Sequence, residues 1–164
     1  MAQKGAFRCR LQALEISLGY LGPSPGRSGV VGLDDLIHIV YVSRRSCELD
    51  DQALMDLQAC CIERNEELGL SGAMILGRDS YFQVLEGPDE QVTAMFEQIK
   101  KDSRHHDIKV LSETYIATQS FEGWAMKFHD GRQRPNLADG YAYEAMCESS
   151  RQEVNKATFN LLRL

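Results

Sequence analysis

The sequence predicts an α+β fold of the split βαβ, or ferredoxin-like, type, with two helices on one face of an antiparallel or mixed sheet. Three observations support this prediction. Segments rich in β-branched and aromatic residues alternate with segments of helical periodicity. Their order is β-α-β-β-α-β-β, and the first six reproduce the split βαβ arrangement. A fifth strand and C-terminal helices follow as additions.

The predicted domain begins with a strand and a helix. Residues 37–43 (IHIVYVS) are rich in β-branched and aromatic residues, which is typical of a buried strand. Residues 50–68 form a helix, because two aspartates favour its positive N-terminal end and apolar residues follow one face. Gly69 then provides a left-handed stop.

A hairpin and a second helix come next. Residues 71–76 and 81–86 are strands joined by a turn at 77–80 (GRDS). Gly87-Pro88 then opens a helix, since proline suits the first helical turn. Its core face carries apolar residues at i, i+3, i+4 and i+7: Val92, Met95, Phe96 and Ile99.

Two further strands, residues 108–117 and 124–128, complete the sheet, and helices follow. A weak helix is expected over 137–147. Residues 150–163 form a better one, which starts at the capping box Ser150–Glu153. Its apolar stripe needs cover from the open face of the sheet, a second copy or a partner. The stripe consists of Val154, Thr158, Leu161 and Leu162.

The chain divides into three parts. Residues 1–35 are an N-terminal extension and linker, with a short amphipathic helix expected at 7–21. Residues 36–130 form the folded domain, and 131–164 form a C-terminal helical cap. The extension is basic, and a targeting peptide remains an alternative to a dispensable extension.

Composition excludes several classes of protein. The 164 residues are 43% hydrophobic and 26% charged, as in a globular protein, and the net charge of −6 disfavours nucleic-acid binding. No apolar run is long enough to cross a membrane. The five cysteines form no C-x-x-C pair, which argues against a disulfide framework and a zinc site. A reduced, cytoplasmic protein is the simplest interpretation.

Three polar residues stand where a plain core would not place them. Tyr41 and Gln83 each lie in the middle of a predicted strand, and Asn65 lies near the end of the first helix. Strand alternation can place the phenol and the carboxamide together under the helices. Buried without partners, each would cost on the order of 1–3 kcal/mol, so they should bond to each other or to a polar ligand.

The motifs around these residues resemble the BLUF domains, blue-light sensors that bind flavin. The resemblance covers residues 36 to 128. Its motifs are Tyr41-Val42-Ser43, Arg64-Asn65 before Gly69, LSGAM at 70–74, YFQVLEG at 81–87, DSRHH at 102–106 and FEGWAM at 121–126.

The resemblance implies a flavin, usually FAD with FMN or riboflavin as substitutes, between the two helices. It implies that Gln83 bridges Tyr41 and the flavin, and that Asn65 holds the ring edge. On blue light Tyr41 gives up an electron and a proton, the Gln83 amide rearranges, and the absorption shifts to the red. Arg104 and His105 would lie near the flavin side chain or phosphates, with Ser43 in support.

Strand parity places Trp124 and Met126 on one face of the fifth strand, where ordinary packing is the alternative to a functional role. The resemblance implies that the two compete for a position beside the glutamine and relay the signal. With no room for an effector domain, the output is expected to pass to an unidentified partner protein. Homo-oligomer formation stays open, and no enzyme activity is expected.

Two other functions compete with this interpretation. A flavin-free interaction module could share the fold. An acylphosphatase-type hydrolase would need a glycine-rich anion loop with arginine after the first strand, but Arg44-Arg45-Ser46 offers no glycine.

Overall fold

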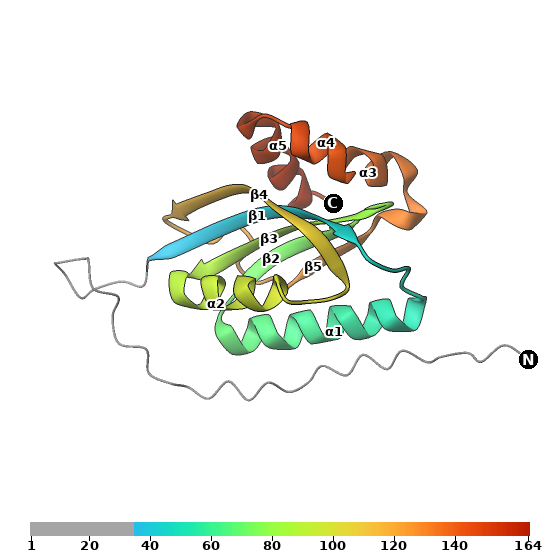
Figure 1. Cartoon of the computed structure of the whole chain (residues 1–164). Helices are drawn as coiled ribbons and strands as arrows, with labels where there is room; N and C mark the ends of the chain where they lie inside the picture. The colour runs from blue at the N-terminus through green and yellow to red at the C-terminus, as the bar shows by residue number, and fades with distance from the viewer. Residues whose placement is uncertain (1–34) are drawn as a thin grey trace, which may run out of the picture. The chain divides into compact units, whose positions relative to one another are not determined.

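The computed structural model describes residues 35–164, so the helix expected at 7–21 lies outside the described residues. Five strands form one sheet, and helices cover both of its faces (Figure 1). The strands are β1 (Leu36–Arg45), β2 (Ser71–Leu76), β3 (Ser80–Pro88), β4 (His105–Ile116) and β5 (Lys127–Asp130). The helices are α1 (Asp51–Leu68), α2 (Asp89–Ile99), the 3-10 turn η1 (Gly131–Gln133), α3 (Pro135–Gly140), α4 (Tyr143–Glu148) and α5 (Arg151–Leu161).

The sheet has the order β4-β1-β3-β2-β5. Strand β3 lies between β1 and β2 and is antiparallel to both, so α1 connects two parallel strands across it. Strand β4 is antiparallel to β1, whereas β5 is parallel to β2 and makes the sheet mixed. The predicted split βαβ fold with a fifth strand is therefore confirmed.

The ends of α1 lie where local chemistry predicts them. The Asp50 side chain accepts a hydrogen bond of 2.8 Å from the Ala53 amide and caps the first turn. Gly69 has a φ of 66° and closes the helix in the left-handed conformation. Helix α2 begins at Asp89, directly after Pro88.

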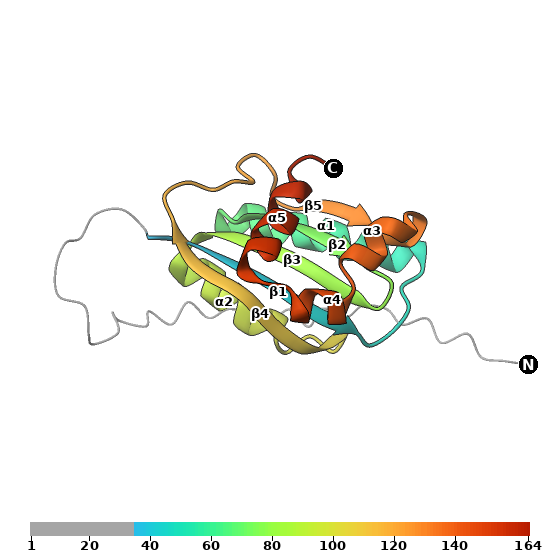
Figure 2. The ribbon, with the colours of Figure 1, turned by 90° about the horizontal axis from the view of Figure 1, so that it is seen from above.

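Side chains pack into a core on each face of the sheet. The helix-pair core lies under α1 and α2, and its buried members include Tyr41, Met74, Leu85, Val92 and Met126. The C-terminal core lies under α3–α5, and its buried members include Val42, Phe82, Val84, Val154 and Leu161. Figure 2 shows the C-terminal helices lying across the sheet. The open face of the sheet thus covers the apolar stripe of α5.

Some element boundaries differ from the predicted ones. The strand expected at 124–128 begins only at Lys127, because the chain is still turning before it. Gly123 has a φ of 85°, and the Trp124 amide donates to the Phe121 carbonyl at 2.9 Å. The helix expected at 137–147 is two helices, α3 and α4, that break at Tyr141, whose hydroxyl donates to the Ala157 carbonyl.

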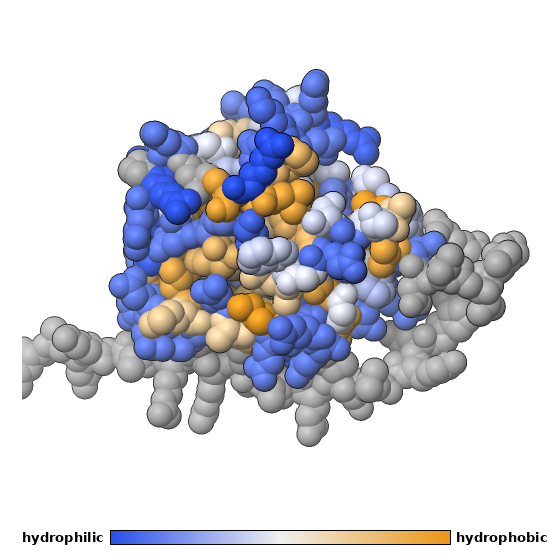
Figure 3. Space-filling model, turned by 180° about the vertical axis from the view of Figure 1, so that it is seen from behind, coloured by the Kyte–Doolittle hydropathy of each residue, from blue (hydrophilic) through white to orange (hydrophobic). Residues whose placement is uncertain are grey.

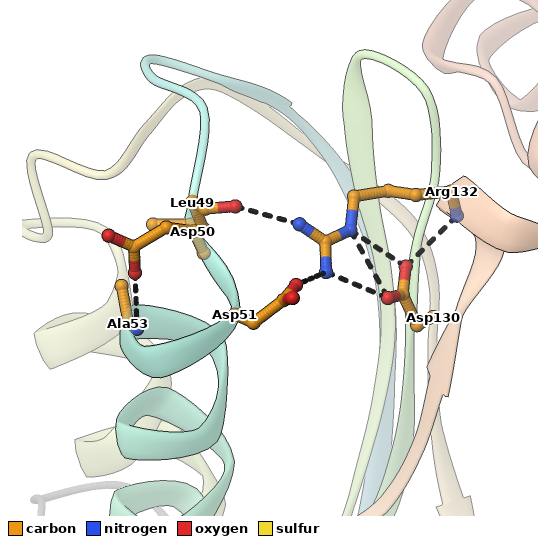
Figure 4. A network of polar contacts seen from close by, with 6 residues as sticks. All are labelled: Leu49, Asp50, Asp51, Ala53, Asp130 and Arg132. Atoms are coloured by element: carbon orange, nitrogen blue, oxygen red, sulfur yellow. Dashed lines mark hydrogen bonds and ion pairs between the residues drawn. The ribbon is translucent and has the colours of Figure 1, made fainter.

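Arg132 connects the end of β5 to the start of α1 (Figure 4). Its guanidinium donates to the Leu49 carbonyl at 2.7 Å and to Asp51 at 3.0 Å. It also forms an ion pair of 2.8 Å with Asp130, and these contacts raise the pKa of Arg132 above its usual value. A planar guanidinium can make these bonds together, so β5 is held in a fixed position relative to α1.

The far side of the molecule presents hydrophobic side chains in groups separated by hydrophilic ones (Figure 3). Among residues 35–164, no helix is long and apolar enough to cross a membrane.

Candidate functional site

The phenol of Tyr41 and the carboxamide of Gln83 meet in the helix-pair core. They are direct partners in the β1–β3 register, and their side chains are 1% and 5% exposed. The Tyr41 hydroxyl donates a hydrogen bond of 2.5 Å to Gln83 Oε1. This bond uses the tyrosine proton and one lone pair of the glutamine.

The surroundings of Tyr41 keep its phenol protonated. Its ring lies 5.2 Å from the Phe96 ring of α2. Burial raises the pKa of Tyr41 well above its usual value, and the nearby Cys61 and Asp102 raise it further. Tyr41 is therefore a neutral hydrogen-bond donor at physiological pH.

Asn65 connects α1 to the segment that precedes β5. It is 2% exposed, and its Nδ2 donates a hydrogen bond of 2.6 Å to the Ala125 carbonyl. The left-handed turn at Gly69 fixes the last turn of α1, which carries Asn65. This contact holds the amide in a fixed orientation at the edge of the core.

The unused hydrogen-bonding groups of this pair of amides match a flavin ring edge. No described residue accepts from Gln83 Nε2 or donates to Asn65 Oδ1. A flavin edge offers acceptors at N5 and O4 and a donor at N3. An amide carries both donors and acceptors. Gln83 Nε2 can therefore donate to N5 and O4, and Asn65 Oδ1 can accept from N3. The residues present fit the group.

Ser43 and His105 form a second polar contact, between β1 and β4. Ser43 Oγ lies 2.8 Å from His105 Nδ1, and His105 Nε2 lies 3.0 Å from the Ile99 carbonyl. Burial lowers the pKa of His105, which favours the neutral ring. Because a carbonyl only accepts, Nε2 carries the proton and Nδ1 accepts from the Ser43 hydroxyl.

Arg104 pairs with Asp102 beside the Tyr41 site. The Arg104 Nε donates to Asp102 Oδ2 at 2.8 Å, and its backbone amide donates to Oδ1 at 2.8 Å. Burial raises the pKa of Asp102, but the hydrogen bonds from Arg104 outweigh burial and hold that pKa below its usual value. The neighbouring Cys61 thiol is buried, which raises its pKa to about 12. This side of the site therefore carries a paired charge and a neutral thiol.

Trp124 and Met126 do not share a face, contrary to the strand-parity prediction. Met126 is 5% exposed and belongs to the helix-pair core, whereas Trp124 is 53% exposed. Neither residue lies in β5, because the chain bends at Ala125 before the strand begins. The structure thus places Met126 inward and Trp124 outward.

Glu86 is a buried residue to which sequence reasoning assigned no role. Its carboxylate accepts from the backbone amides of Ser120 and Phe121, at 2.6 and 3.1 Å. The side chain is fully buried. A charged residue of the same strand parity as Phe82 and Val84 is the signal that predicts such a buried carboxylate.

Arg44 and Arg45, the last two residues of β1, are bound to protein partners. Arg44 forms ion pairs with Asp79 and Glu144, and Arg45 forms one with Glu48. Within residues 35–164, no group of three or more histidines, cysteines or acidic residues is placed to hold a metal ion. The four cysteines of this part, Cys47, Cys60, Cys61 and Cys147, are free thiols.

Comparisons with known proteins identify the family of this chain. The family model "BLUF: Sensors of blue-light using FAD" matches residues 36–127. The photoactivated adenylate cyclase subunit alpha of Euglena gracilis is 28% identical over 107 residues, which is 64% of this chain and 10% of that relative. The blue light- and temperature-regulated antirepressor BluF of Escherichia coli (strain K12) is 27% identical over 97 residues, or 59% of this chain and 24% of BluF.

Solved structures give the same result. The photo-activated state of BlsA is 28% identical with a TM-score of 0.64, and the match covers 79% of this chain and 96% of that one. The dark-state structure of BlrB, a BLUF protein, shares the fold, with 22% identity, a TM-score of 0.70, and coverage of 79% of this chain and 97% of that one. This chain spans a tenth to a quarter of the length of the curated relatives described above. The protein belongs to the BLUF family of blue-light sensors that use FAD.

Proposed function

We propose that Tyr41 and Gln83 carry out the response of this sensor to blue light. The observation that carries the proposal is the buried 2.5 Å hydrogen bond from the Tyr41 hydroxyl to Gln83 Oε1. When bound, the flavin supplies the absorption of blue light and a transient electron acceptor. Tyr41 would give up one electron to that acceptor and pass its hydroxyl proton along this bond to Gln83 Oε1. Gln83 Nε2 would release a proton toward the ring edge, so that the amide becomes its imidic-acid tautomer and can rotate.

Glutamine suits this task because one planar group both donates and accepts. A rearranged Gln83 presents a different donor pattern to the ring edge while the total number of hydrogen bonds is kept. A glutamate there would place a charge in a buried site, at a large desolvation cost. The proton and electron return to Tyr41, so the chain undergoes no net redox change.

The remaining site residues hold the cofactor and support the pair. Gln83 Nε2 and Asn65 Oδ1 bind the ring edge, with Asn65 fixed by the Ala125 carbonyl. Arg104, which follows α2, binds the flavin side chain or phosphates, and His105, whose two ring nitrogens bond to Ser43 and the Ile99 carbonyl, lies near them. Ser43 supports them through its hydrogen bond to His105. FAD is the cofactor, with FMN or riboflavin as substitutes.

The proposed output is a contact with a separate partner protein in the cytoplasm rather than chemistry by this chain. Curated relatives are named as a photoactivated adenylate cyclase and as an antirepressor, so this type of domain is found with different outputs. Trp124 and Met126, which take opposite positions just before β5, are the proposed relay.

An absorption spectrum before and after blue light tests the proposal. The purified full chain should be yellow and should show a small red shift that reverses in the dark. Tyr41→Phe and Gln83→Leu should abolish the shift while flavin stays bound. Tyr115→Phe is the matched control, because Tyr115 is 50% exposed and should leave the shift intact. A normal shift in Tyr41→Phe, or a colourless protein that refuses added flavin, would overturn the proposal.

A further inference from the structure

Lys127, the first residue of β5, lies between the segment that carries Trp124 and the end of helix α5. Its Nζ lies 4.8 Å from the centroid of the Trp124 ring. The same nitrogen donates a hydrogen bond of 3.1 Å to the Leu162 carbonyl, and Leu162 is the C-cap residue of α5. One ammonium group therefore contacts both the proposed relay residue and the end of the C-terminal helix.

The C-terminal end of α5 is stabilised by a nearby cation that can donate a hydrogen bond. The last carbonyls of a helix have no partner within it, and the negative end of the helix dipole favours a cation. Helix α5 has no basic residue in its last turn. Arg163 lies just beyond the C-cap Leu162, and Lys127 adds a second positive charge and a donor to the Leu162 carbonyl from β5. Because Val154 and Leu161 are buried against the sheet, Lys127 acts on the end of α5 and not on the docking of the whole helix.

Trp124 offers Lys127 a second partner that can move. An indole face attracts a cation more strongly than any other aromatic side chain. The backbone of Trp124 is fixed on both sides, by bonds to the Phe121 carbonyl (2.9 Å) and the Gly72 amide (3.2 Å). Rotation of the exposed ring is therefore the change of position that leaves these bonds intact.

We propose that Lys127 is a positioning residue that transmits the position of Trp124 to the C-terminal end of α5. This inference rests on the proposed function, in which Trp124 and Met126 relay the light signal. While Trp124 points outward, its ring and the Leu162 carbonyl together order the ammonium group. When the ring leaves, Lys127 becomes more mobile, its bond to Leu162 opens more often, and the last turn of α5 frays.

Hydrogen–deuterium exchange of the FAD-loaded full chain, in the dark and under blue light, measures this effect. In the wild type, exchange in residues 159–164 should rise about two- to fivefold on illumination, which corresponds to the loss of an exposed cation–π contact. Lys127→Met should exchange at the raised rate already in the dark, with no further rise. Lys127→Arg keeps a donor and a cation and should restore the light response.

Arg163→Gln is the matched control. Arg163 Cζ lies 4.9 Å from the Phe159 ring, so this change also removes one charge and one cation–π contact from the end of α5. It does not involve Trp124, and the light response should remain. A loss of the response in Arg163→Gln equal to that in Lys127→Met would overturn the proposal.

A spectroscopic measurement separates positioning from a purely structural effect. Trp124 is the only tryptophan, so all tryptophan fluorescence comes from the ring that Lys127 contacts. Iodide is attracted by a nearby ammonium group, whereas acrylamide is neutral. Lys127→Met should weaken iodide quenching in the dark and leave acrylamide quenching unchanged. Equal iodide quenching in both proteins would contradict the assignment.

Absorption spectra of the same samples distinguish a failure of the proposed function from a failure of the role proposed for Lys127. A missing red shift in the wild type would contradict the proposed function itself. A normal red shift would leave the proposed function standing. If α5 then showed no light response in the wild type, or the same response in Lys127→Met, only the role of Lys127 would be overturned.

Discussion

Met126 is buried in the helix-pair core while Trp124, two residues earlier in the chain, is 53% exposed. In a regular strand these two residues would share a face. They do not, because the chain turns at Gly123 and bends at Ala125 before β5 begins. The segment therefore offers one side chain to the core and the other to solvent.

Because Met126 is buried and Trp124 is exposed, substitutions at the two positions should lower the free energy of unfolding by unequal amounts. Met126→Ala should lower the free energy of unfolding by about 2–5 kcal/mol, because it opens a cavity in a packed core. Trp124→Ala should cost about 1 kcal/mol or less, since it removes an exposed cation–π contact. Urea denaturation followed by circular dichroism, at a fixed FAD concentration, measures both. Equal losses would show that the indole is packed inside.

Asn65→Ala should weaken both FAD binding and the attachment of the segment before β5. The change removes the donor to the Ala125 carbonyl and the amide proposed to hold the ring edge. FAD affinity should fall about tenfold, the size of a lost buried hydrogen bond. Titration of flavin-free protein with FAD measures it. Glu63→Ala, on the exposed side of α1, is the control, and equal affinity in both variants would argue against Asn65 as a ligand.

Glu86→Ala should destabilise the loop between β4 and β5. The Ser120 and Phe121 amides would lose their acceptor, at a cost of about 2–4 kcal/mol in the free energy of unfolding. Glu113→Ala on the exposed side of β4 should change stability by less than about 0.5 kcal/mol. Urea denaturation compares them. A loss below about 1 kcal/mol in Glu86→Ala would mean that solvent replaces the carboxylate.

The partly buried His105 predicts a loss of stability in mild acid. A histidine in an unfolded chain has a pKa of about 6.5, and burial lowers the pKa of His105 in the folded protein. The unfolded state then binds more protons, so the contribution of neutral His105 is present above about pH 6.5 and is lost as pH falls through the folded pKa.

His105→Gln should remove the contribution of His105 to the pH dependence of the free energy of unfolding. Burial also lowers the pKa of His129, so part of the acid sensitivity should remain in the variant. Free energies of unfolding at pH 7.5 and pH 5 should therefore differ less in His105→Gln than in the wild type. Identical differences in the two proteins would show that His105 does not titrate as its burial predicts.

The parts of the fold that depend on local chemistry could be predicted from the sequence. Asp50 and Gly69 mark the ends of α1 because capping and left-handed stops need only a few neighbouring residues. Tyr41 and Gln83 could be expected to meet, since strand alternation and the split βαβ order place them on neighbouring strands.

Other features depend on distant backbone atoms and have no local signal. The partner of Asn65 is a main-chain carbonyl of Ala125, 60 residues away, which any residue at that position could provide. The positions of Trp124 and Met126 follow from a bond between the Trp124 carbonyl and Gly72 on another strand. Glu86 is different, because its place in a buried strand is visible in the sequence.

The C-terminal core means that the unit that folds is longer than the stretch that the family model matches. The family match ends at residue 127, yet Val154 and Leu161 cover Phe82 and Val84 of the sheet. A protein shortened to residues 36–127 would expose one hydrophobic face of its sheet to water and would tend to aggregate. Residues 131–164 are accordingly needed for solubility, whatever part they play in signalling.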